Sequence, residues 1–162
     1  MATTTVRPAR AADVSLVHAL IGELAEYERL AHAMVATPDD LQATLFGDRP
    51  SAEVLIGELD GRGVGFALYF QNYSTFLGKP GLYLEDLFVR PEARGRGVGR
   101  ALFLSVARRA VDRGCGRMEW SVLDWNQPAI DFYRAQGAIA MDEWTTFRLH
   151  GAALQAAGTR GS

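Results

Sequence analysis

Hydrophobic positions recur along the chain with two periods, and segments of each period alternate. Apolar residues fall at helical spacing in four segments, residues 12–30, 38–46, 98–113 and 127–136. Strand-like composition or alternation marks the segments between and after them, residues 52–59, 64–73, 82–89, 117–123 and 138–149. This order predicts one α/β (α+β) domain over residues 3–151, followed by a frayed tail over residues 152–162.

Residues with special backbone preferences mark where these elements begin and end. Thr37 is a predicted N-cap ahead of Pro38, and Asn126 is the predicted N-cap of a later helix, because both side chains can accept from free N–H groups. Gly137 follows that later helix as a C-cap. Asp-Gly at residues 60–61 predicts a hairpin turn, since both residues tolerate positive φ.

Charge and composition narrow the function classes. The formal net charge of −2 over 162 residues argues against a protein that coats nucleic acid. A single cysteine cannot form a disulfide framework within one chain, and the three histidines match no metal spacing. The N-terminal residues lack the basic segment followed by an apolar segment that is typical of a secretory signal. No apolar run is long enough to span a bilayer. We therefore expect a cytoplasmic protein that binds no metal, nucleic acid or membrane.

A glycine-rich turn, Arg94-Gly-Arg-Gly-Val-Gly99, lies between a predicted strand and a predicted helix. Backbone without side chains can approach a ligand closely, and the first N–H groups of a helix have no internal partner. The helix dipole and three arginines, at positions 94, 96 and 100, add a field that favours an anion such as pyrophosphate. The turn lacks the Lys-Ser/Thr of a Walker A loop and the Gly-x-Gly-x-x-Gly spacing of a dinucleotide turn. A turn with a basic rim and no ligand is the alternative.

Two motifs in this order resemble the GNAT superfamily of N-acetyltransferases. The turn at residues 94–99 resembles their pyrophosphate motif, and the segment from Asn126 to Gly137 resembles their second cofactor motif. Further segments extend the resemblance to nearly the whole chain: residues 23–28, 46–48, 78–79, 83–86 and 122–127. These segments resemble the spermidine/spermine (diamine) and thialysine N-epsilon-acetyltransferase branch. The resemblance implies a mixed, splayed sheet of six to seven strands with helices on both faces, and a homodimer.

The resemblance also implies acetyl-coenzyme A as the acyl donor and indicates its binding residues. They lie on the strand before the turn, in the turn and on the later helix: Leu87, Phe88, Val89, Arg94, Gly95, Arg96, Gly97, Val98, Gly99, Arg100, Asn126, Phe132 and Tyr133. Free backbone groups of a splayed strand can pair with the pantetheine amides, as in strand addition.

Two adjacent carboxylates, Glu85 and Asp86, interrupt the apolar strand at residues 82–89. In a regular strand they point to opposite faces, and a buried carboxylate without a partner has a raised pKa. Such carboxylates indicate function, while a salt bridge to an arginine is the alternative. The resemblance implies that Glu85 relays the amine proton through water and that Asp86 and Glu28 bind the amine. A solvated helix end explains Glu28 equally well.

Tyr133 lies near the end of the helix that Asn126 begins. A phenol can donate a proton to the departing thiolate of coenzyme A, although core packing of its ring is the commoner use of such a residue. The resemblance implies the role of general acid.

Together these features predict an acetyl-coenzyme A-dependent N-acetyltransferase of a small primary amine: thialysine, a lysine-like amino acid or a diamine. No covalent nucleophile is recognisable, so we expect direct transfer in a ternary complex. Ser74 and Phe76 replace an acid and a tryptophan of the polyamine branch, which favours a smaller amine. The alternatives are a protein or peptide N-acetyltransferase and a non-catalytic acyl-coenzyme A-binding module.

Overall fold

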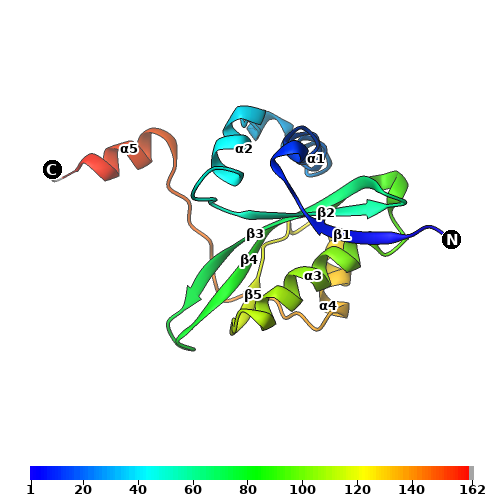
Figure 1. The fold of residues 1–162 in the computed structure, drawn as a ribbon. Coiled ribbons are helices and arrows are strands. Elements are labelled where there is room, and N and C mark those ends of the chain that lie inside the picture. The colour runs from blue at the N-terminus through cyan, green and yellow to red at the C-terminus, as the bar shows by residue number, and fades with distance from the viewer. Residues whose placement is uncertain (161–162) are drawn as a thin grey trace. The chain divides into compact units, whose positions relative to one another are not determined.

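The computed structural model describes residues 1–160, and Figure 1 traces the chain. The chain forms two compact units, one of residues 1–123 and a smaller one that begins at Asp124. Within residues 1–160, five strands form one sheet: β1 (Thr4–Pro8), β2 (Glu53–Leu59), β3 (Arg62–Ser74), β4 (Lys79–Val89) and β5 (Arg117–Glu119). The helices of the first unit are α1 (Val14–Tyr27), α2 (Pro38–Leu45) and α3 (Val98–Asp112), with short 3-10 turns at Ala11–Asp13, Ala31–Ala33 and Pro91–Ala93.

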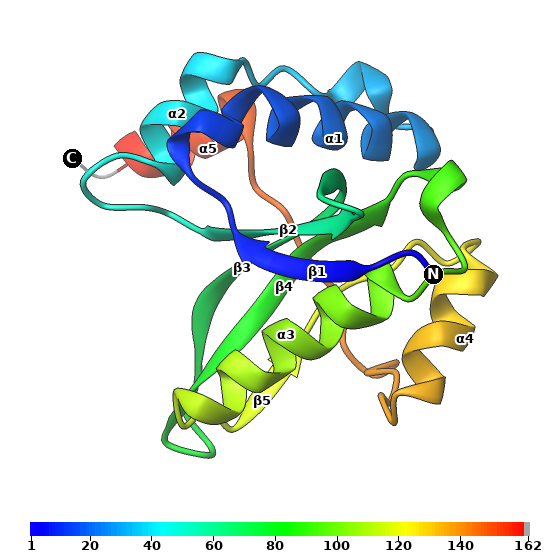
Figure 2. The same cartoon turned by 45° about the vertical axis from the view of Figure 1, so that its right-hand side comes forward.

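The sheet is mixed and lies between helices. Its strand order is β1-β2-β3-β4-β5, with antiparallel neighbours except for the parallel pair β4–β5. Helices α1 and α2 cover one face and α3 covers the other (Figure 2). The predicted fold class, with helices on both faces, is therefore confirmed, although the described sheet has five strands where we expected six or seven.

A hydrophobic core lies on the face of the sheet beneath α1. Val17 and Leu20 of α1 are fully buried against Ile56 and Phe66 of the two central strands. Helix α2 begins where the sequence predicts it, because Thr37 accepts a hydrogen bond from the Asp40 backbone N–H at 3.2 Å and returns one to the Asp40 carboxylate at 2.8 Å.

The opposite face brings α3 close to the sheet. A side chain at Gly57 of β2 would lie 2.6 Å from the Val98 side chain and 3.0 Å from that of Leu102, so glycine there permits the close approach. Val98, Leu102 and Val106 are buried along this contact. The start of α3, and with it the glycine-rich turn, is thereby fixed against the sheet.

The smaller unit contains α4 (Gln127–Ala135) and α5 (Gly151–Thr159). As predicted, the Asn126 side chain caps α4 by accepting from the Ala129 N–H at 3.3 Å, and Gly137 follows with φ of 91°. No helix within residues 1–160 has both the length and the apolarity that a bilayer span requires.

Three segments differ from the sequence predictions. Residues 138–149 form no strand, and their large apolar side chains, such as Ile139 and Phe147, are exposed. Alternation favours a strand only if a neighbouring strand pairs with it, and none of the described strands does. Strand β1 carries too few apolar residues to be predicted. Helix α5 forms where we expected a frayed tail, while residues 161 and 162 lie outside the described part of the chain.

Candidate active site

The glycine-rich turn joins the end of β4 to the start of α3. Gly95 and Gly97 have φ of 76° and 85°, the left-handed region that favours glycine, and a side chain at either position would meet nothing within 4 Å. Backbone conformation and ligand access, rather than internal crowding, therefore account for these glycines. Gly97 is the N-cap of α3 and no side chain caps the helix, so its first N–H groups can receive an anion.

The arginines of the turn have two different placements. The Arg94 Nε donates to the Val89 carbonyl at 2.8 Å, and its guanidinium carbon lies 4.8 Å from the centre of the Tyr27 ring. Arg94 thus ties the turn to the end of β4 and to the end of α1. Arg96 and Arg100 are exposed and remain at the rim of the turn. Tyr27 was not among the predicted site residues, and its position beside Glu28 was the only signal for it.

Strands β4 and β5 separate beside the turn. Strand β5 pairs with β4 only as far as Tyr83, so Leu84–Val89 extends past it, and the Tyr83 and Ser121 hydroxyls are hydrogen-bonded at 2.9 Å where the strands part. The Arg90 N–H donates to the Val64 carbonyl at 2.8 Å on the β3 side. By the alternation of an antiparallel ladder, Phe88 also points its backbone groups to β3, while Leu87 and Val89 point theirs away from it.

The three residues of the predicted cofactor strand therefore differ in which groups they leave accessible. Leu87 and Val89 offer backbone groups on the side away from β3, with the Val89 carbonyl already accepting from Arg94. The Phe88 side chain is 5% exposed and belongs to the core beneath α1. The Phe88 side chain therefore packs in the core, and its contact with the cofactor stays a prediction.

A β-bulge lies at Glu85. Asp86 pairs with Leu68 and Leu84 pairs with Tyr69, which leaves Glu85 as the extra residue of β4. The bulge interrupts the regular alternation on which we based opposite directions for Glu85 and Asp86. The sequence of β4 alone does not predict the bulge, because a bulge depends on the register with the neighbouring strand.

Glu85, Asp86 and Glu28 form an acidic cluster. Burial raises the pKa of Asp86 to about 7, and the charges of Glu85 and Glu28 add to that effect. Burial also raises the pKa of Glu28, which ends α1, and the Glu85 charge adds to it. Glu85 itself is exposed. Among residues 1–160 no arginine or lysine pairs with these three carboxylates, and no group of three or more ligating side chains is arranged to hold a metal ion.

The hairpin tip that carries Ser74 and Phe76 is remote from this cluster within one chain. Ser74 pairs with Lys79, and Glu85 lies six positions further along β4, about 20 Å of strand from Lys79. Ser74 is buried and its hydroxyl accepts from the Leu77 N–H at 3.2 Å, whereas Phe76 is fully exposed. The Ser74 side chain therefore stabilises the hairpin.

The remaining predicted residues lie in the smaller unit. Asn126 is the N-cap of α4, and Phe132 and Tyr133 lie in the second half of the helix. The Phe132 and Tyr133 rings contact each other with centroids 5.5 Å apart. The structure thus gathers the predicted residues into two groups, the turn, strand and acidic cluster in the first unit and these three side chains in the second.

Comparison with known proteins identifies the family. Residues 18–138 match the model of the acetyltransferase (GNAT) family. The chain is 39% identical to a thialysine N-epsilon-acetyltransferase of Bos taurus, with 96% of this chain and 97% of that protein covered. It is 36% identical to an L-ornithine N5-acetyltransferase of Arabidopsis thaliana, over 93% of this chain and 86% of that protein.

A solved structure has the same fold. An integron cassette protein from the mobile metagenome of V. cholerae superimposes with a TM-score of 0.80 at 25% identity, covering 96% of this chain and 98% of the other. The family suggested by the glycine-rich turn and the Asn126 motif is confirmed. The chain belongs to the GNAT family of acetyltransferases, in the branch that contains the thialysine N-epsilon-acetyltransferases.

Proposed function

We propose that this enzyme transfers the acetyl group of acetyl-coenzyme A to a primary amine of a small molecule. The acceptor is thialysine, a lysine-like amino acid or a short diamine, and the transfer is direct, within a ternary complex. The relatives named for thialysine and ornithine support an amino acid that carries a side-chain amine. A homodimer in the cytoplasm belongs to the same proposal, on the resemblance and the composition alone.

The acidic cluster is the observation that carries this proposal. Glu28 lies at the end of α1, and Glu85 and Asp86 lie in the middle of β4, without a basic partner among the described residues. Burial raises the pKa of Asp86, and repulsion from the charges of Glu85 and Glu28 adds to that effect. An alkylammonium, which is charged at neutral pH, supplies the missing positive charge. A neutral or anionic acceptor would leave this repulsion in place.

The donor is held by the glycine-rich turn and the separated strand. The N–H groups that open α3 bind the pyrophosphate, with Arg96 and Arg100 adding positive charge at the rim. Leu87 and Val89 offer backbone groups to the pantetheine arm. Asn126 and Phe132 of α4 complete the proposed cofactor contacts.

The proposed chemistry needs one base and one acid. Glu85 accepts a proton from the bound ammonium through a water molecule, and the free amine attacks the thioester carbonyl. A tetrahedral intermediate forms, and its nitrogen gives up a second proton as the carbon–sulfur bond breaks. Tyr133 protonates the departing thiolate, and the second proton from nitrogen restores the Tyr133 phenol through water. Asp86 and Glu28 hold the acceptor cation before it loses its proton.

A thiol-release assay with acetyl-coenzyme A tests the proposed activity. The amines are thialysine, ornithine, lysine, putrescine, spermidine, an aminoglycoside and a short peptide, with the acetylated product identified by mass. We expect thialysine, ornithine or lysine to give the highest kcat/KM, with one acetylated amine for each thiol released. Cofactor binding without thiol release on any amine would contradict the proposal, as would a preference for the peptide.

The acid is tested by Tyr133→Phe, with Tyr73→Phe as its matched control. Tyr73 is 59% exposed at the hairpin, so its hydroxyl has no part in the proposed chemistry. We expect kcat to fall about 100-fold in Tyr133→Phe, within the range for loss of a general acid, and to stay unchanged in Tyr73→Phe. Full turnover by Tyr133→Phe at every pH would remove Tyr133 from the mechanism.

A further inference from the structure

A pocket lies at the other end of α3 from the glycine-rich turn. Its volume is about 350 Å³, enough for a small organic molecule. From Val98 to Arg113 the helix rises about 22 Å, so a molecule in this pocket is too far from the turn to touch a bound pyrophosphate. The residues that line the pocket include Phe46, Pro50, Glu53, Tyr69, Arg109 and Arg113.

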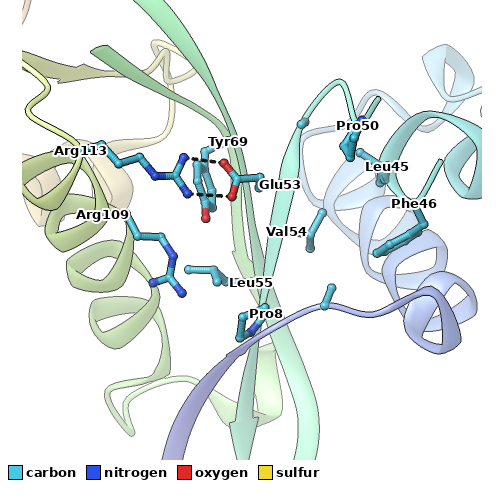
Figure 3. A pocket seen from close by; sticks show the side chains of 12 residues that line it. Pro8, Leu45, Phe46, Pro50, Glu53, Val54, Leu55, Tyr69, Arg109 and Arg113 are labelled. Carbon is cyan, nitrogen blue, oxygen red and sulfur yellow. Dashed lines mark hydrogen bonds and ion pairs between the residues drawn. The ribbon is translucent and has the colours of Figure 1, made fainter. Parts of the chain in front are cut away.

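One wall of the pocket is a fixed ion pair. The Arg113 guanidinium donates to both Glu53 carboxylate oxygens, at 2.6 and 2.8 Å (Figure 3). This pairing lowers the pKa of Glu53, and the Arg113 guanidinium carbon also lies 5.9 Å from the centre of the Tyr69 ring. Arg113 is therefore paired with Glu53, and the pair forms one boundary of the pocket.

Arg109 adds a positive charge that this pair does not neutralise. It lies one helical turn before Arg113, and Figure 3 shows its guanidinium beside the pair, on the side of β2 that carries Leu55. Within residues 1–160, its Nη1 donates to the Ser105 carbonyl at 3.3 Å and no carboxylate forms an ion pair with it. Two arginines and one glutamate are the charged lining residues, so the lining has a net charge of +1.

The opposite wall is apolar. Leu45, Phe46 and Pro50 lie on the other side of β2 from the two arginines (Figure 3). On the arginine side of β2, the buried Tyr69 side chain is within electrostatic reach of Arg109, whose charge counteracts the burial that raises the pKa of Tyr69 (Figure 3). A ligand that fits both walls has an anionic end and an apolar body.

We propose that this pocket binds a small monocarboxylate with an aromatic or branched apolar body. The carboxylate pairs with the Arg109 guanidinium, whose planar fork matches its geometry, and the apolar body lies against Phe46 and Pro50. A cation would be repelled by the net positive lining. A phosphate dianion would carry its second charge beside Glu53, which disfavours it relative to a carboxylate.

Benzoate is the probe, and binding is followed by ligand-observed NMR on protein saturated with coenzyme A. Benzamide, a neutral molecule of the same shape, tests the need for the charge. Arg109→Gln removes the proposed partner, and Arg108→Gln is its matched control, because Arg108 is the preceding residue of α3 and is exposed. We expect benzoate to saturate below about 10 mM and benzamide to bind at least about tenfold more weakly.

The variants separate this site from general charge effects. Arg109→Gln is expected to weaken benzoate binding by about tenfold or more, while Arg108→Gln binds like the wild type. Four results would each overturn the proposal: no saturable benzoate binding, equal binding of benzamide, wild-type affinity in Arg109→Gln, or the same loss in Arg108→Gln. Competition by coenzyme A would likewise place benzoate in the cofactor site. Because the readout is binding at this pocket, its outcome does not depend on which amine is acetylated.

Discussion

The fold shifts the pKa values of two aspartates of the first unit in opposite directions. Asp13, before α1, accepts two hydrogen bonds from Arg7 at 2.8 and 2.9 Å, and this pairing lowers its pKa to about 2. The same Arg7 reaches Glu58 at 3.1 Å. Asp86, in the middle of β4, has no such partner among the described residues, and burial raises its pKa to about 7.

The difference distinguishes a carboxylate that an arginine pairs in the folded protein from carboxylates that have no basic partner among the described residues. Where a carboxylate only supports structure, an arginine neutralises it, because burying an unpaired charge opposes folding. The acidic cluster of Glu28, Glu85 and Asp86 instead keeps its repulsion in the folded protein. We propose that a substrate ammonium binds to this cluster, which would offset the stability that the unpaired charges remove.

The largest expected effect is on catalysis. Asp86→Asn removes one charge that we propose to hold the ammonium, so kcat/KM for thialysine should fall about 100-fold. Asp13→Asn should leave kcat/KM within about twofold of the wild type, because its charge is paired with Arg7. Steady-state thiol release well below the melting temperature measures both. Equal losses in the two variants would show that the cluster has no special part in turnover.

Asp86→Asn should also stabilise the protein at neutral and alkaline pH. Folded Asp86 keeps its proton up to a pKa of about 7, whereas the unfolded residue releases it near 3.8. Between these values the folded state binds more protons, so wild-type stability falls as pH rises. Urea unfolding at pH 4, 6 and 8 should therefore show a gain of about 2 kcal/mol in the variant at pH 8 and little change at pH 4. A loss of stability at pH 8 would contradict the unpaired state of Asp86.

Asp13→Asn should change stability in the opposite direction. The pKa of folded Asp13, about 2, is below its unfolded value of 3.8, so its contribution is present above pH 3.8 and is lost as pH falls through 2. Because the Arg7 side chain is 27% exposed and water screens the pair, the variant should lose only about 1 kcal/mol at pH 7. Urea midpoints at pH 7 and pH 2 measure the difference, and an equal loss at both would exclude the ion pair as its cause.

The smallest effect is expected at the more exposed pair of Glu53 and Arg113. Their side chains are 46% and 38% exposed, so Glu53→Gln should reduce stability by about 0.5 kcal/mol at low salt and less in 1 M NaCl. Glu53→Gln should therefore reduce stability less than Asp13→Asn does, because the Glu53–Arg113 pair is more exposed than the Asp13–Arg7 pair. A loss larger than that of Asp13→Asn would mean that exposure does not rank these ion pairs.

Local chemistry made part of the fold and site predictable. Thr37 and Asn126 cap the helices that the sequence assigns to them, and Asp60 and Gly61 adopt the positive φ that their predicted turn requires. Each of these features depends on a few consecutive residues, so the sequence contains the whole cause. The same holds for the glycine-rich turn and the Asn126 motif, which were sufficient to identify the family.

Features that depend on pairing between distant segments were not predictable. The bulge at Glu85 is fixed by the register with β3, and it changed the relation we expected between Glu85 and Asp86. Arg94 was predicted as a cofactor residue, but its contact with the Val89 carbonyl requires the turn to fold back onto β4. Residues 138–149 alternate as a strand does, yet without a neighbouring strand the described chain forms none there.

The pH dependence of kcat/KM for thialysine tests the central claim most directly, when wild type, Asp13→Asn and Asp86→Asn are measured together. The account predicts that wild-type kcat/KM rises with pH through an apparent pKa near 7, because the acidic cluster must lose a proton to bind the ammonium. Asp13→Asn should keep this rise, and Asp86→Asn should lose it or move it well away from 7. An unchanged rise in Asp86→Asn would contradict the claim that the unpaired cluster binds the acceptor.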